Sequence, residues 1–220
     1  SSVGSMVASI LGLLAIMLAF TFNLAASRFD ARRQVVLEEA NAIGTTWLRA
    51  RLLPEPQRSE IADLLRDYVD ARVSHVDYST IDARLARSEE LQELIWSRGV
   101  TAAESAPQSI MTGLFLQSLN EVIDLHAKRV MVGLRSRLPL ILWVALFSLV
   151  IVGMLSVGYQ AGLSGTRRSP AEFLLAISFA VVLLLIVDLD RAHAGLLRVD
   201  KHALIDLQRS MQTAQPRSER

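Results

Sequence analysis

The chain has 220 residues, of which 51% are hydrophobic and 20% are charged, and its formal net charge is +1. This charge is too small to indicate a nucleic-acid-binding protein, and no mixture of basic and aromatic residues suggests stacking on bases. Nucleic acid is therefore excluded as a partner. The chain has no cysteine, which excludes a disulfide framework, a thiolate nucleophile and a thiolate metal site.

Three segments of the chain are apolar and free of charge. Residues 3–27 and 138–166 are each long enough to cross a bilayer, and residues 173–187 form a shorter third candidate. The sequence therefore predicts an all-α integral membrane protein with three transmembrane helices. Since no initiator Met and no basic segment precede the first apolar stretch, we expect a span there rather than a signal peptide, and a native chain that begins upstream.

Basic residues indicate how the spans are oriented. They cluster next to three span ends, whereas the loop between the second and third spans carries only Arg167 and Arg168. Lysine and arginine are enriched on the cytoplasmic side of membrane proteins. The predicted parts are a transmembrane helix, a cytoplasmic helical domain, a transmembrane helix, an external loop, a transmembrane helix and a cytoplasmic C-terminal segment, at residues 1–27, 28–137, 138–161, 162–169, 170–190 and 191–220.

The predicted cytoplasmic domain is nearly balanced in charge and helical. Residues 28–137 carry 15 basic and 16 acidic side chains, and their apolar residues recur at helical spacing. Residues 28–53 contain no proline, so the first span is expected to continue as a helix. Gly99 is expected to end a surface helix. Ser105–Gln108 has the form of a capping box that starts another helix, which is expected to run toward the second span and to be interrupted at Pro139.

Small residues at intervals of four are followed by large apolar residues on the first span. They are Gly4, Ala8, Gly12, Ile16 and Phe20, and this spacing places them on one broad helix face. Small residues so spaced allow close packing of helices in lipid. The alternative is that this face surrounds an axis shared with other copies of the chain. Ile16 and Phe20 would then form an apolar constriction.

Polar residues continue this segment toward the cytoplasm. Asn23 and Ser27 suit a pore vestibule or, equally, a hydrogen bond between helices. Four charged residues follow at the predicted inner mouth: Arg28, Asp30, Arg32 and Arg33. The arginines suit interfacial anchoring, and around a pore they would attract anions.

No residue pattern indicates a metal site, a cofactor or an enzyme. Asp188 and Asp190 are two residues apart on a predicted helix and cannot share one cation, so we expect them to pair with Arg191 or a neighbouring helix. The histidines show no metal-binding spacing; they are His75, His126, His193 and His202. No nucleophile, acid–base or nucleotide-binding motif occurs.

The stretch from Phe20 to Arg32 resembles the pore-helix signature of bestrophins. In that signature a neck Phe is followed by Asn, Ala, Arg, an aromatic pair and an acidic-Ala-Arg ending. The matching residues are Phe20, Asn23, Ala25 and Arg28. The chain departs from the pattern at Thr21, where bacterial members often carry a basic residue, and its Asp-Ala-Arg ending comes one residue early.

Over its whole length the chain is similar to a bacterial and plant membrane family often labelled bestrophin-like. The segments that carry this likeness are residues 38–45, 52–54, 135–139, 158–159, 162–165 and 189–191.

The bestrophin resemblance implies an all-helical homo-oligomer, usually a pentamer, that conducts chloride and other monovalent anions. It also implies a span upstream of Ser1 and a central pore lined by residues 6–27. Ile16 and Phe20 match neck positions, and Gly12 matches the outermost one. The leading hypothesis is such a channel in the bacterial inner membrane. The alternative is a non-conducting membrane scaffold or signalling module whose residues 28–137 bind a cytoplasmic partner.

Overall fold

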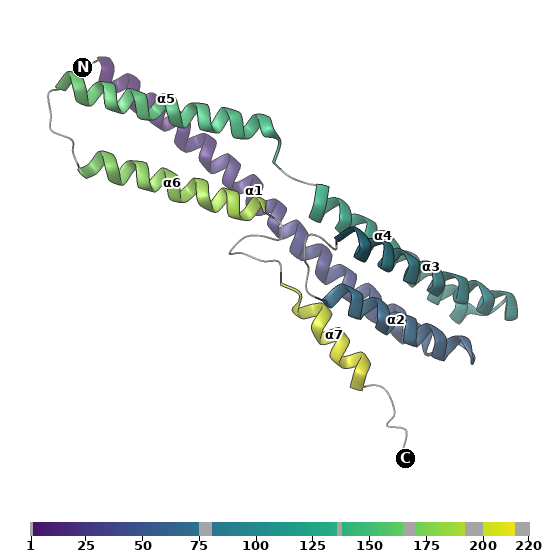
Figure 1. Ribbon diagram of the computed structural model, residues 1–220. Coiled ribbons are helices and arrows are strands. Elements are labelled where there is room, and N and C mark those ends of the chain that lie inside the picture. Colours follow the sequence, from purple (N-terminus) through teal and green to yellow (C-terminus); the bar gives the residue numbers. More distant parts are fainter. Residues whose placement is uncertain (1, 75–80, 136–137, 165–169, 192–199, 214–220) are drawn as a thin grey trace. The chain divides into compact units, whose positions relative to one another are not determined.

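The computed structural model describes residues 2–74, 81–135, 138–164, 170–191 and 200–213. These residues form helices and no strand (Figure 1), which confirms the predicted all-α fold. In chain order the helices are α1 (Ser2–Ala50), α2 (Gln57–Val73), α3 (Ile81–Ser105), α4 (Ile110–Val130), the π-helix η2 (Met131–Arg135), α5 (Leu140–Ser164), α6 (Pro170–Asp190) and α7 (His202–Thr213). The chain divides into unit 1 (Ser1–Arg32 and Val132–Val199) and unit 2 (Arg33–Met131 and Asp200–Arg220).

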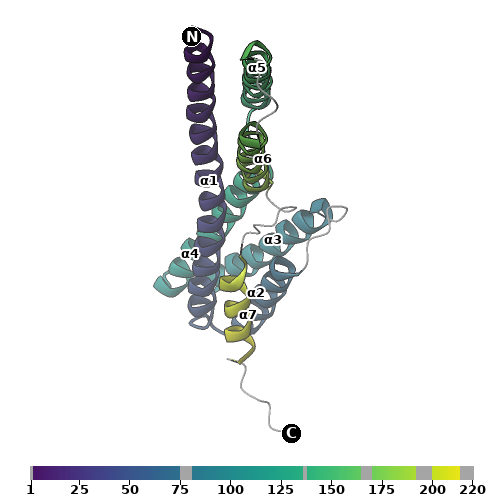
Figure 2. The same ribbon diagram turned by 90° about the vertical axis from the view of Figure 1, so that its left-hand side faces the viewer.

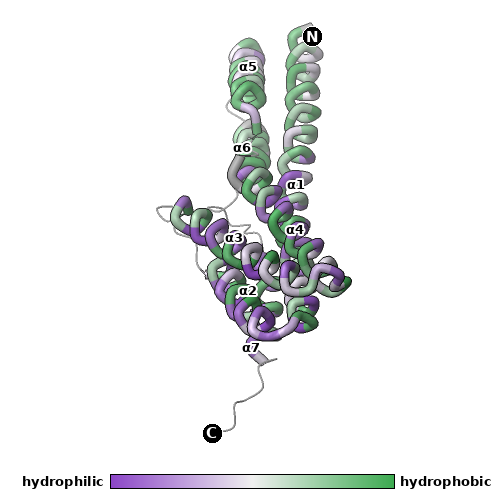
Figure 3. Tube along the Cα trace, turned by 90° about the vertical axis from the view of Figure 1, so that its right-hand side faces the viewer, coloured by the Kyte–Doolittle hydropathy of each residue, from purple (hydrophilic) through white to green (hydrophobic). Residues whose placement is uncertain are grey.

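Helices α1, α5 and α6 are long and apolar enough to cross a membrane, as the sequence predicted. Their residues are coloured mainly as hydrophobic in Figure 3, except in the second half of α1. Helix α6 has 21 residues and is therefore about 30 Å long, which matches the roughly 30 Å hydrocarbon core of a bilayer. Little of the three apolar windows is buried within the chain, so most of their surface is left for lipid or for other helices.

Helix α1 contributes to both units. It is one uninterrupted helix of 49 residues, which confirms that the first span continues as a helix beyond Arg28. At 1.5 Å per residue it is about 70 Å long, more than twice the thickness of a hydrocarbon core of about 30 Å. Residues 2–32 of α1 belong to unit 1 and residues 33–50 to unit 2.

The core of unit 1 joins α1 to α5 and α6. Its buried residues are Leu14, Leu18 and Ala25 of α1, Leu138 before α5, Leu146 of α5, and Ile186 and Leu189 of α6. Gly153 of α5 faces α1, since a Cβ atom built there would lie at ordinary contact distance from Leu11 Cδ2, 3.6 Å, and Leu14 Cδ2, 3.7 Å. Pro139 separates η2 from α5, so the predicted interruption before the second span is confirmed.

Unit 2 is a bundle built from α2, α3, α4, α7 and the second half of α1. Its largest fully buried apolar side chains include Ile61, Leu65, Leu91, Ile95, Phe115 and Leu119. Helix α7 lies beside α2 (Figures 1 and 2). The contact buries Leu204 and Met211 of α7, and Gln208 Nε2 donates to Asp70 Oδ1 at 2.7 Å.

Two helix boundaries expected from the sequence are wrong. Helix α3 continues through Gly99 and ends at Ser105. A Cβ atom at position 99 would lie only 2.7 Å from Leu116 Cδ2 of α4. Gly99 therefore allows α3 and α4 to pack closely and does not end the helix. Ser109 caps α4 instead of Ser105, since its side chain accepts a hydrogen bond from the Thr112 amide.

A buried polar cluster lies at the centre of unit 2. We name it the Glu39 cluster, and its members are Glu39 of α1, Tyr68 and Arg72 of α2, Gln92 of α3, and His126 and Arg129 of α4. Glu39 Oε1 pairs with Arg72 Nη2 at 2.9 Å, and Glu39 Oε2 pairs with Arg129 Nη1. Gln92 Nε2 donates to Tyr68 Oη at 3.0 Å. The cluster therefore links four helices through side chains that are buried or nearly so.

Burial favours the neutral forms of two members of this cluster, His126 and Tyr68. It lowers the pKa of His126 to about 4, and the positive charges of Arg72 and Arg129 add to the effect. It also raises the pKa of Tyr68. His126 is therefore a neutral imidazole near pH 7, and its charged form is disfavoured by both desolvation and repulsion.

The pKa of His126 makes the stability of unit 2 depend on pH. An unfolded histidine titrates near 6.5 and the folded one near 4, so the unfolded chain binds more protons between these values. The free energy of unfolding is expected to decrease by up to about 3 kcal/mol as the pH falls through this window, and to be regained as it rises. Thermal unfolding of the detergent-purified protein across pH measures the effect.

The contribution of His126 is separated from that of the carboxylates by two variants. His126→Asn removes the titrating ring and is expected to flatten the pH dependence between 6.5 and 4. His202→Asn changes an exposed histidine of α7 that pairs with Asp200, and it is expected to keep the decrease that His126 causes between pH 6.5 and 4. The same slope in all three proteins would contradict the assignment.

Candidate functional site

One face of α1 carries the predicted neck and vestibule residues in a nearly straight line. We name it the open face, and its residues in unit 1 are Gly12, Ile16, Phe20, Asn23, Ser27 and Asp30. Eighteen residues separate its ends, which is five turns of a helix with 3.6 residues per turn. The line is apolar as far as Phe20 and polar from Asn23 onward.

The open face is exposed among the described residues. Ile16 is 56% exposed and Phe20 is 70% exposed, and a Cβ atom built on Gly12 would meet no described atom within 4 Å apart from its own helix backbone and chain neighbours. Asn23 and Ser27 are exposed as well. These side chains are therefore available to lipid, to water or to another copy of the chain.

The opposite face of α1 is the packed one. Its buried residues in unit 1 include Leu14, Leu18, Thr21, Ala25 and Arg32. On a helical projection at 100° per residue they lie roughly 180° to 240° from Gly12. Packing against α5 and α6 thus fixes which side of α1 remains exposed.

Arg32 differs from the other predicted inner-mouth residues because it is buried. Its Nη1 donates to the Leu189 carbonyl at 3.0 Å and its Nη2 donates to the Asp190 carbonyl at 3.2 Å. Its Nε donates to the Val132 carbonyl of η2 at 3.4 Å. These oxygens include the last carbonyls of α6, where the helix dipole favours a cation. The guanidinium of Arg32 is thus engaged by backbone and directed away from the open face.

The other three charged residues are less enclosed. Asp30 and Arg33 are exposed, and Arg28 is half-buried. Arg28 Nη1 is buried and has no hydrogen-bond partner among the described residues. On the helical projection Asp30 coincides with Gly12, Arg33 flanks the open face at about 60°, and Arg28 lies about 160° away.

Asp190 links α6 to α5. Its Oδ1 accepts a hydrogen bond from the Leu138 amide, two residues before α5 begins, at 2.9 Å. This carboxylate meets an unpaired amide at a helix N-terminus, where negative charge is favoured. Asp190 was expected to pair with Arg191 or a neighbouring helix, and this bond joins it to the segment that leads into α5.

The exposed side of α1 continues into unit 2. Its exposed residues there include Gln34, Asn41, Thr45 and Leu48. They fall within about 60° of Gly12 on the same projection. The open face therefore extends along most of α1 and is mainly polar beyond Phe20.

The described residues offer no group of three or more histidine, aspartate or glutamate side chains placed to hold a metal ion. His75 and His193 lie outside the described residues.

The roles of Arg32 and Glu39 were missed by the sequence analysis. A helical projection of α1 places both on the side of Leu14, about 180° to 200° from Gly12. The projection alone therefore indicates that Arg32 lies on the side of α1 opposite the open face. It does not reveal the partners, because the Arg32 and Leu189 positions are 157 residues apart in the chain.

The fold is similar to those of several solved membrane proteins. A bacterial bestrophin homologue from Klebsiella pneumoniae, obtained by zinc SAD phasing, matches with a TM-score of 0.74 and 15% identity over 96% of this chain and 88% of that chain. A mutant of a Klebsiella pneumoniae bestrophin homologue matches with a TM-score of 0.72 and 15% identity over 95% and 86%. A crystal structure described as a membrane protein gives a TM-score of 0.76 and 14% identity over 95% and 86%. At these identities the likeness shows the fold alone.

Sequence comparison gives the family. No protein with a curated description matches the chain. The pattern of the Bestrophin-like domain matches residues 2–204, which is nearly the whole chain. The protein is therefore a membrane protein that belongs to the Bestrophin-like family.

Proposed function

We propose that the protein is an oligomeric ion channel in which the open face of α1 lines a central pore. The observation that carries this proposal is the exposed line from Gly12 to Asp30 on a membrane helix whose opposite face is packed. A line that includes Asn23 and a carboxylate is costly to expose to lipid, so a water-filled path is its better environment.

The apolar part of the line would form the neck. In a ring of copies, Ile16 and Phe20 from each chain would face the axis, with Gly12 at the outermost level. Apolar constrictions of this kind gate by dewetting and favour ions that lose their hydration easily. Asn23 and Ser27 would follow as a vestibule in which ions are rehydrated.

Chloride or another monovalent anion is the proposed permeant ion. At the level of the inner mouth Arg28 and Arg33 against Asp30 give each copy a net charge of +1, and a ring of copies multiplies this charge. Arg33 flanks the open face, whereas Arg28 lies about 160° from it and would attract anions only at long range. Arg32 adds little there, because its guanidinium is held by backbone carbonyls. Bestrophins conduct such anions, and membership of the Bestrophin-like family supports the same substrate class here.

The proposed assembly is a homo-oligomer, with a pentamer favoured by the bestrophin likeness. In the proposed topology residues 28–137 and the C-terminus lie in the cytoplasm of a bacterial cell and residues 162–169 form the external loop. The low burial of the three membrane helices within one chain supports contact with lipid and with other copies. Native mass spectrometry of the purified protein measures the number of copies.

Phe20→Ala is expected to raise chloride flux about tenfold, because removing the ring widens the apolar neck, and a barrier lowered by about 1.4 kcal/mol gives that factor. Purified full-length protein is assayed in liposomes. The matched control is Phe173→Ala on α6, since Phe20 and Phe173 are each 70% exposed.

Equal flux in Phe20→Ala, Phe173→Ala and wild-type protein would contradict the neck assignment. If an intact wild-type oligomer conducts no ion at all, the channel proposal fails. The scaffold function would then be favoured, and recovery of a stable complex through residues 28–137 from cell membranes would test it.

The vestibule assignment is tested with introduced thiols, for which the chain is convenient because it contains no cysteine. Ser27→Cys, followed by a charged thiol reagent, is expected to reduce flux by more than half, because the adduct would obstruct the water-filled path where a thiolate can form. The matched control is Ser178→Cys, at an exposed serine of α6. Equal inhibition of both variants, or of neither, would count against this position for the open face.

A further inference from the structure

The Glu39 cluster has one more positive charge than negative charge. Glu39 is fully buried and contributes one negative charge, while Arg72 and Arg129 contribute two positive charges. The side chain of Arg72 is only 9% exposed and that of Arg129 is 20% exposed. A buried net charge is costly unless an opposite charge accompanies it.

Two nitrogen atoms of the cluster have no hydrogen-bond partner among the described residues. They are Arg72 Nε and His126 Nε2, and both are buried. Arg72 Nε is always a donor. Unpartnered buried polar atoms are uncommon in native proteins, and each calls for a bound water, an ion or another explanation.

The hydroxyl of Tyr68 determines what His126 Nε2 can offer. Tyr68 Oη lies 3.4 Å from Glu39 Oε1 and 3.5 Å from His126 Nδ1, and its single proton can serve only one of them. Glu39 already accepts from two arginines. The anion site proposed below requires that this proton is directed to Nδ1, because a neutral His126 then carries its own proton on Nε2 and presents an unpartnered donor.

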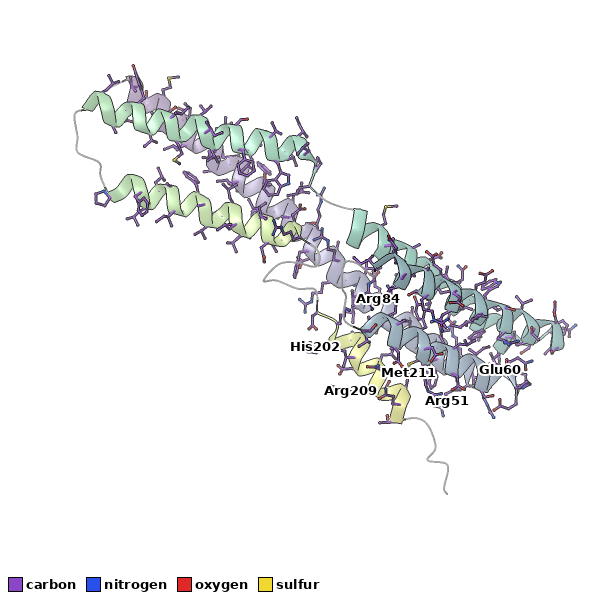
Figure 4. All side chains as sticks on the ribbon, viewed as in Figure 1. Arg51, Glu60, Arg84, His202, Arg209 and Met211 are labelled. Carbon is purple, nitrogen blue, oxygen red and sulfur yellow. The ribbon has the colours of Figure 1, made fainter. Side chains whose placement is uncertain are left out.

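The surroundings of the cluster are also positive. Lys201 Nζ lies 3.3 Å from the Ser74 carbonyl at the end of α2, and Arg84 Nη2 donates to the Ala71 carbonyl at 2.6 Å. Arg84 is labelled in Figure 4. Burial lowers the pKa of Lys201 to about 8, and repulsion by Arg129, Arg84 and Arg72 contributes. Glu38, which precedes Glu39 in the chain, pairs with Lys128 at 2.8 Å.

We propose that the Glu39 cluster binds one small monovalent anion of the halide class, which accepts hydrogen bonds from Arg72 Nε and His126 Nε2. The anion cancels the excess charge and satisfies both donors. It acts as a structural ion of unit 2, separate from any ion that moves along the open face, and the proposal does not depend on conduction. A neutral water would satisfy the donors but would leave the charge unbalanced.

A halide titration of the full-length protein in detergent tests this site. Sodium bromide replaces sodium gluconate at constant ionic strength, and the thermal unfolding midpoint is recorded. At roughly ten times the dissociation constant, the midpoint is expected to rise by about 3 to 5 °C and then to level off. A general salt effect would continue to change with concentration.

Three variants locate the effect. His126→Asn keeps an amide near the position of Nδ1 and removes the Nε2 donor, so the bromide shift is expected to disappear. His126→Gln places an amide nitrogen near the position of Nε2 and is expected to restore at least half of the shift. His202→Asn, at the exposed histidine labelled in Figure 4, is expected to keep the full shift.

Bromide-soaked crystals of the wild type provide a second measurement that does not require the variants to fold. An anomalous peak is expected within hydrogen-bonding distance of Arg72 Nε and His126 Nε2. A wild-type midpoint that is the same in gluconate and bromide, an undiminished shift in His126→Asn, or no anomalous peak at the cluster would each overturn the proposal in favour of water.

Discussion

The packed face of helix α1 is the constraint on which both units depend. On a helical projection, one sector about 60° wide contains a buried residue at nearly every turn. These residues are Leu14, Leu18, Thr21, Ala25, Arg32, Val36, Glu39, Ile43 and Ala50. Residues of this sector are buried in the part of α1 that belongs to unit 1 and also in the part that belongs to unit 2.

Two buried charged residues fix the rotation of α1 about its own axis more strictly than apolar contacts alone would. Arg32 and Glu39 are seven residues apart and lie on the same side of α1. Arg32 is held by carbonyls of α6 and η2, and Glu39 is held by arginines of α2 and α4. A buried charge that loses its partners is strongly destabilising. Rotating or shifting α1 is therefore disfavoured even where one leucine would move into the position of another.

This division of α1 explains how one helix can be structural and functional at once. The open face carries no core residue, so Ile16, Phe20 and Asn23 can change without loss of the packing that orients them. Its character changes from apolar to polar within one turn, between Phe20 and Asn23. In the proposed pore, the packed side of α1 would set the orientation of the helix, and the exposed side would supply the side chains that line the pore.

The sequence by itself determined the spans, the continuation of the first span into a long helix and the break at Pro139, since length, hydrophobicity and proline act locally. It also placed Gly12, Ile16 and Phe20 on one face, because helical periodicity depends only on spacing. The prediction that Gly99 ends a helix was wrong, because its packing partner Leu116 lies on the next helix. Only the tertiary structure decided that Arg32 and Glu39 are buried and that the neck residues are exposed. The reason is that helical periodicity groups residues by face, whereas the face that becomes buried depends on packing partners up to 158 residues away in the chain.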